Sequence, residues 1–322
     1  MTPDPADLTP AQDLTPADPT PPRTPTVVPP PPGVPGPPTG VDLAAGWSAA
    51  AIRGAERPLL EAGVPLMARA AAGLAEVLRG VLGTVGRDAA RPGHVLLLVG
   101  SGSNGGDALF AGAALADEGH RVTVVRTGGR VHEDGLAAAT TAGAVADDPE
   151  DWSDPASARL RLRGVDVVVD GILGTGTSAS PALRGTGAEV VAALLAALRG
   201  EGPGRASGPD EGAPGGTGVE GVAHATGPAE GASGGTGVAG PTRASGPAGP
   251  PVVVACDLPS GTGPDDGSVP VDVVLPAAVT VTFGACCAGL LLPPARAFAG
   301  EVVVVDIGVG PGLAGVDPLV RP

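Results

Sequence analysis

The stretch VGSGSNGGDALF, from Val99 to Phe110, decides the fold of this chain. It leaves an apolar run over 95–99, turns on four glycines and predicts a helix that begins near Asp107. Glycine permits positive φ angles and lets a ligand approach the peptide N–H groups closely. A helix N-terminus adds unpaired N–H donors at the same point. The strand, turn and helix therefore predict a binding site.

The sequence on either side predicts a sheet covered by helices. Valine-rich runs with little polar alternation indicate strands buried on both faces, and they lie at 95–99, 122–125, 167–169, 252–255, 279–283 and 302–305. Apolar residues at helical spacing lie between and before them, at 41–85 with a break at Gly63 and Pro65, 108–118, 135–142 and 188–198. This alternation predicts an α/β fold: a three-layer α/β/α Rossmann-like sandwich with a mostly parallel central sheet.

Two stretches hold too little apolar surface to build a core. Residues 1–40 contain 15 prolines, so we expect a disordered acidic tail, with a docking segment as the alternative. Residues 200–250 carry a glycine-rich near-repeat of about 19 residues, which favours a low-complexity insertion in a surface loop over a solenoid. One interrupted domain over 41–312 remains, with a short C-terminal tail over 313–322.

The composition excludes several kinds of chemistry. All 19 basic residues are arginines, and the formal net charge is −15. Without lysine, neither a Schiff base nor a P-loop lysine is available, and the acidic balance argues against nucleic acid or an anionic membrane as partner. No apolar run approaches the ~18 residues of a membrane span and no signal peptide is recognisable, so we expect a cytoplasmic protein.

Three of the expected strands end in a glycine-rich loop that carries a carboxylate. Asp107 follows the first loop, Asp170 begins DGILGTGTS, and Asp257 begins DLPSGTGPDDG. In a doubly wound sheet the site lies beyond the carboxyl ends of the strands. We therefore expect the three loops to meet at one edge.

The first loop also permits a different function. It matches the dinucleotide pattern G-x-G-x-x-G, and Arg126 lies near the end of the next strand, where an NADP-dependent oxidoreductase places a phosphate-binding arginine. Asp107 disagrees with that function, because it puts a carboxylate where a pyrophosphate would meet the helix. The alternative for Asp107 is a helix cap.

Taken together, the motifs resemble the NAD(P)H-hydrate epimerase family, the YjeF N-terminal domain. The resemblance covers 47–310 apart from the insertion, and it rests on LMARAA (66–71), GSGSNGGDA (100–108), DGILGTG (170–176), DLPSG (257–261), TVTFG (280–284) and DIG (306–308). It implies an isomerase that interconverts the R and S hydrates of NADH and NADPH, called NADHX and NADPHX. An NAD(P)H-hydrate dehydratase, on a separate chain or a further domain, would then restore the S form. A homodimer is left open.

The resemblance also implies roles for single residues. It places Asp257 against the hydrated ring, and our own hypothesis is that Asp257 is the catalytic general acid and base, with a pKa raised by burial or Asp170, or lowered by a cation. The substrate would be bound by Asp257 together with Ser103, Asn104, Gly105, Gly106, Asp107, Gly174, Thr175, Gly176, Thr177, Ser178, Ala179 and Ser180. One K⁺ per subunit would be held by Asn104, Asp170 and Ser260, whose oxygens suit a hard cation.

Three positions depart from the family pattern. Ser103 replaces an asparagine, Ala108 replaces a glycine, and Cys287 stands where the family has a lysine. The lost lysine removes a cation from the expected phosphate region, so that either the affinity is lower or another group such as Arg296 compensates.

A binding or scaffold module without chemistry is the main rival to an enzyme. Retention of Asp107, Asp170, Asp257 and Ser260 together argues against it.

Overall fold

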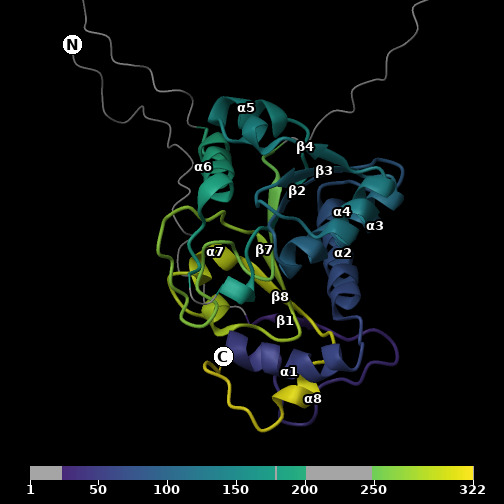
Figure 1. The fold of residues 1–322 in the computed structure, drawn as a ribbon, viewed down its shortest axis with the longest axis vertical. Coiled ribbons are helices and arrows are strands. Elements are labelled where there is room, and N and C mark those ends of the chain that lie inside the picture. Colours follow the sequence, from purple (N-terminus) through teal and green to yellow (C-terminus); the bar gives the residue numbers. More distant parts are fainter. Residues whose placement is uncertain (1–23, 178–179, 201–248, 322) are drawn as a thin grey trace, which may run out of the picture. The chain divides into compact units, whose positions relative to one another are not determined.

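A parallel sheet of eight strands lies at the centre of the computed structural model, which describes residues 24–177, 180–200 and 249–321 (Figure 1). The strands run in the order β1-β8-β7-β6-β5-β2-β3-β4, and each neighbouring pair is parallel. Their bounds are β1 Thr26–Val28, β2 His94–Val99, β3 Arg121–Arg126, β4 Val145–Asp147, β5 Val167–Gly171, β6 Val252–Cys256, β7 Val279–Phe283 and β8 Glu301–Val305. The expected α/β sandwich is confirmed.

Helices cover both faces of this sheet (Figure 1). They are α1 Ala49–Glu61, α2 Leu66–Thr84, α3 Ser103–Asp117, α4 Glu133–Thr141, α5 Pro155–Arg161, α6 Gly185–Leu198, α7 Arg296–Ala299 and α8 Gly310–Leu313. Successive side chains of β2 point to opposite faces. Thus Leu97 packs in the cluster that includes α2 and α3, whereas Leu96 and Leu98 pack in the cluster that includes α5 and α6.

The order of the strands reverses between β2 and β5. From β2 the chain moves outward through β3 to β4, and it then returns to β5 on the other side of β2. The loops that follow β2 and β5 therefore diverge from one point, which is where doubly wound proteins bind their ligands.

The structure differs from the sequence expectation at the N-terminal tail. Thr26–Val28, within the segment expected to be disordered, forms β1 and pairs with 303–305 of β8. Three residues between prolines give no strand signal of their own, and they are ordered by the exposed edge of β8. Residues 1–23 lie outside the described residues, as does nearly all of the insertion expected over 200–250.

The C-terminal residues also contact the domain. Leu313 is buried, and Gly46 donates a hydrogen bond of 2.8 Å to the carbonyl of Val320. No helix in the described ranges is both long and apolar enough to cross a bilayer.

Candidate active site

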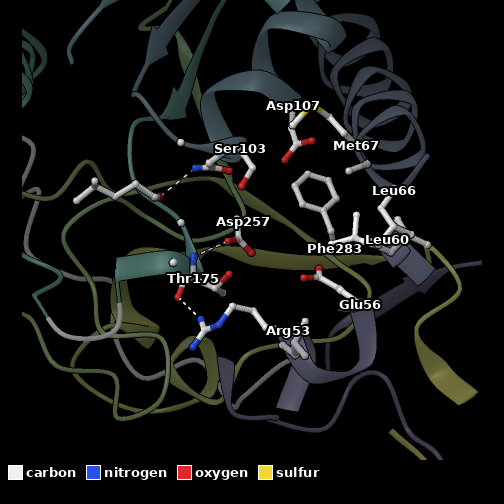
Figure 2. Close-up of a pocket in the computed structure, with 18 of the residues that line it drawn as sticks. Arg53, Glu56, Leu60, Leu66, Met67, Ser103, Asp107, Thr175, Asp257 and Phe283 are labelled. Atoms are coloured by element: carbon white, nitrogen blue, oxygen red, sulfur yellow. Dashed lines mark hydrogen bonds between the residues drawn. The ribbon is translucent and has the colours of Figure 1, made fainter. Parts of the chain in front are cut away.

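A cavity of about 420 Å³ opens beyond the carboxyl ends of β2, β5 and β6 (Figure 2). Its walls are the N-terminal turns of α3, the loops after β5 and β6, the end of β7, and helices α1 and α2. Apolar side chains, among them Leu60, Leu66, Met67 and Phe283, form one part of the lining, and the carboxylates of Glu56, Asp107 and Asp257 the other. An apolar pocket with a few convergent polar groups is typical of a small-molecule site.

Asp257 follows β6 in a strained conformation. Its φ angle is +71°, and no other non-glycine residue of the described ranges has a positive φ. Its Oδ2 accepts a hydrogen bond of 2.7 Å from the amide of Thr175, and its Oδ1 accepts one of 3.2 Å from Thr282 Oγ1. A Cβ atom on Gly174 would lie 2.6 Å from Oδ2, so only glycine leaves room for this contact. Burial raises the pKa of the Asp257 carboxyl despite these hydrogen bonds.

Two further carboxyl groups share the cavity with Asp257. Burial, with the charges of Asp257 and Glu56, raises the pKa of Asp107 to about 8. Burial and the charge of Asp257 raise the pKa of Glu56 to about 7, while Arg53 opposes the shift. Asp107 Oδ1 is buried and has no hydrogen-bond partner among the described residues. Carboxyl groups with pKa values near neutrality can donate and accept protons, as general acids and bases must.

Asp107 does not cap α3. The helix begins at Ser103, four residues earlier than expected, and Gly102 is its N-cap. Asp107 therefore lies in the second turn and faces the cavity (Figure 2).

The side chain of Asn104, at the start of α3, contacts two backbone carbonyl oxygens. Its Nδ2 donates to the carbonyls of Leu173 (3.0 Å) and Cys256 (2.9 Å), which follow β5 and end β6. Its Oδ1 is buried without a partner in the described part of the chain.

Asp170 and Ser260 form a second polar group nearby. Ser260 Oγ donates to Asp170 Oδ1 at 2.6 Å, and the Ser260 amide donates to Oδ2 at 2.8 Å. Burial raises the pKa of Asp170, which forms no ion pair with any described arginine. The Leu173 amide donates to Ser260 Oγ, which links this pair to the loop that Asn104 contacts. A buried carboxylate and the unpartnered amide oxygen of Asn104 make an oxygen-rich donor set that fits K⁺.

The residues expected to bind substrate are only partly brought together. Those that line the cavity are Ser103, Asn104, Asp107, Gly174, Thr175, Gly176 and Asp257. Gly105 and Gly106 are buried inside α3, and Ser180 is exposed and accepts a hydrogen bond from Arg184. Ser178, Ala179 and the side chain of Thr177 lie outside the described residues.

The cavity also contains residues that the motifs did not reveal. Arg53 and Glu56 project from α1, and Arg53 Nη1 donates a hydrogen bond of 2.8 Å to the carbonyl of Thr175. The available signal was their three-residue spacing, which places both on the face of α1 that also carries Ile52.

Neither residue discussed for the expected phosphate region lines this cavity. Cys287 is buried outside the lining, and Arg296 does not line the cavity either. Among the described residues, the basic side chain in its lining is Arg53.

The fold and the cavity define a doubly wound α/β protein with an acidic pocket where the order of the strands reverses. Residues 63–201 match the family described as YjeF-related protein N-terminus. The chain belongs to the NAD(P)H-hydrate epimerase family, because it is 46% identical over 279 residues to the NAD(P)H-hydrate epimerase of Clavibacter michiganensis subsp. michiganensis, covering 87% of this chain and 96% of that protein.

Two other proteins are similar to this chain over most of its length. It is 34% identical over 272 residues to the Bifunctional NAD(P)H-hydrate repair enzyme Nnr of Mycobacterium tuberculosis, covering 82% of this chain but 41% of that protein. The crystal structure of yeast ynu0, YNL200c, matches with a TM-score of 0.50 at 15% identity, covering 76% of this chain and 82% of that one. At this identity the match supports the fold alone.

Proposed function

We propose that this chain is an NAD(P)H-hydrate epimerase, an isomerase that interconverts the R and S forms of NADHX and NADPHX. The observation that carries the proposal is the group formed by Glu56, Asp107 and Asp257, whose pKa values are all raised in one partly apolar cavity. The identity of the substrate is inferred from the family relationship.

The walls of the cavity suit the chemistry of such a reaction. Inversion at C6 of the hydrated ring requires the C–O bond to break and to form again on the other face. One carboxyl donates a proton to the departing hydroxyl, water leaves, water adds to the opposite face, and a carboxylate takes up the proton. Asp257 lies on one wall, and Phe283 lies between Asp107 and Glu56 (Figure 2). We assign proton transfer at one face to Asp257, and at the other to Glu56 or Asp107.

We further propose that Asn104, Asp170 and Ser260 hold one K⁺ per subunit. A bound K⁺ would neutralise Asp170 and hold the loops after β2, β5 and β6 together. The test is a KCl titration in tetramethylammonium buffer, followed by thermal unfolding as well as by activity. A melting temperature that rises with KCl in the wild type but not in Asp170→Asn supports the site. An equal rise in both proteins argues against it.

The similarity to a bifunctional repair enzyme supports the idea that this chain works together with a second enzyme activity. We propose that an NAD(P)H-hydrate dehydratase consumes the S hydrate that this chain forms. A cytoplasmic location and a homodimer stay predictions.

A coupled assay tests the proposed function. R-NADHX or R-NADPHX is supplied with an S-specific dehydratase and its nucleotide, and the recovery of reduced-nicotinamide absorbance is measured with and without the protein. Recovery faster than spontaneous epimerisation is the expected result. A folded, K⁺-supplied protein that gives no acceleration would favour a binding module. Oxidation of intact NADPH would instead favour the oxidoreductase.

A further inference from the structure

A second cavity, of about 320 Å³, lies after β3, on the other side of β2 from Asp257. Arg126, the last residue of β3, and Arg130 line it with Gly128, Gly129, Val131 and Glu133. Neither arginine forms an ion pair within the described ranges. Two unpaired guanidinium groups in a chain of net charge −15 indicate a site for an anion.

This cavity adjoins the loop that lines the first one. A Cβ atom on Gly128 would lie 3.2 Å from the amide nitrogen of Ser101, and Ser101 lines the first cavity. The loops after β2 and β3 therefore pack directly on each other.

The order of the strands bears on how one dinucleotide could occupy both cavities. Strands β4-β3-β2-β5-β6-β7 follow the doubly wound order in which a dinucleotide binds across the switch point, one half over each set of strands. Asp257 and Phe283 line the first cavity beyond β6 and β7, which is where the proposed reaction would put the reacting ring. The adenosine half then extends over β2 and β3, where an arginine is the group that accommodates a 2′-phosphate.

We propose that Arg126 and Arg130 bind the 2′-phosphate on the adenosine ribose, so that the enzyme prefers NADPHX to NADHX. This inference rests on the proposed epimerase function. Planar guanidinium groups bind phosphate through paired hydrogen bonds. Glu133, in the first turn of α4, carries the opposing charge in this cavity and limits the preference.

The preference is tested by measuring kcat/KM for each hydrate. In Arg126→Ala and in Arg130→Ala the NADPHX:NADHX ratio falls about tenfold, as expected for one charge-assisted hydrogen bond. Glu133→Gln raises the ratio. The matched control is Arg163→Ala, an exposed arginine ahead of β5 at the opposite end of the strands, which leaves the ratio unchanged. Equal losses on both hydrates, or an unchanged ratio in both arginine variants, would overturn the inference.

A binding measurement separates this inference from the proposed function. Isothermal titration calorimetry compares adenosine 2′,5′-bisphosphate with adenosine 5′-monophosphate, so it requires no turnover. Tighter binding of the bisphosphate, lost in Arg126→Ala and Arg130→Ala, supports the site even if neither hydrate is epimerised. Equal binding of the two probes by the wild type overturns it even if both hydrates are epimerised.

Discussion

Asp257 is held in place by its own backbone. A non-glycine residue at φ +71° is uncommon, and such strain concentrates where a side chain must be aimed. The amide of Thr175 and the absence of a side chain at Gly174 fix where the carboxylate lies. Asp257 is therefore positioned before any substrate arrives, which lowers the cost of reaching the reactive arrangement.

We expect Asp257→Asn to lower kcat by about 10²–10⁴-fold, the usual contribution of a general acid or base. The amide oxygen still accepts from the Thr175 amide and the new NH₂ can donate to Thr282 Oγ1, so the melting temperature stays close to that of the wild type. The coupled assay and a thermal melt measure the two effects. Asp272→Asn, on an exposed carboxylate, is the control. Wild-type turnover in Asp257→Asn would remove Asp257 from the mechanism.

The raised pKa of Asp107 leads us to expect that the free energy of unfolding depends on pH. Its pKa in the folded protein is about 8, above the value of about 4 expected when unfolded, so the folded state binds the proton more tightly. This stabilisation is complete below pH 4 and is lost as the pH rises to about 8. Denaturant unfolding should therefore show Asp107→Asn gaining stability relative to the wild type between pH 4 and 8. A difference independent of pH would contradict the raised pKa.

At the scale of the elements, α3 can begin directly after β2 because Gly105 has no side chain. A Cβ atom there would overlap the carbonyl oxygen of Gly100. We expect Gly105→Ala to destabilise the protein by about 1–3 kcal/mol, because the obstruction is backbone. Gly80→Ala is the matched control in α2, where a Cβ meets nothing, and it should stabilise by about 0.5–1 kcal/mol. Equal effects in urea denaturation would contradict this packing.

The sheet could be predicted from sequence because parallel strands buried on both faces leave unbroken apolar runs, as in HVLLLV of β2. The loops with Asp170 and Asp257 could be predicted because each follows such a run. Arg53 and Glu56 could not, since they occupy ordinary helix positions. Only tertiary packing brings Arg53 to Thr175, 122 residues away in sequence.

At the scale of the whole molecule, the chain divides into a unit formed by 1–202 with 246–322 and a second unit formed by 203–245. The strands, helices and cavities described above belong to the unit formed by 1–202 and 246–322. Connections from a helix to the next strand usually take about 2–6 residues. The end of α6 at Leu198 can therefore be joined to the start of β6 at Val252 without residues 203–245.

We expect a chain lacking 203–245 to keep the melting temperature and the epimerase activity of the full chain. Differential scanning calorimetry and the coupled assay compare the two proteins. A deletion of equal length over β7 and β8 is the control that should abolish folding. Loss of activity in a stable 203–245 deletion would give that segment a functional role.

Helix α1 carries Arg53 and Glu56, yet it packs mainly against α8 rather than against the sheet (Figure 1). The segment before α1 and the segment after α8 are joined by backbone hydrogen bonds between Gly46 and Val320. We therefore expect α1, which builds this part of the cavity wall, and α8, which packs against it, to open together as one local unit. In hydrogen–deuterium exchange its amides should exchange ahead of those in β2. Early exchange in this wall beside protected β2 amides would show that the wall opens while the sheet that carries Asp257 stays intact.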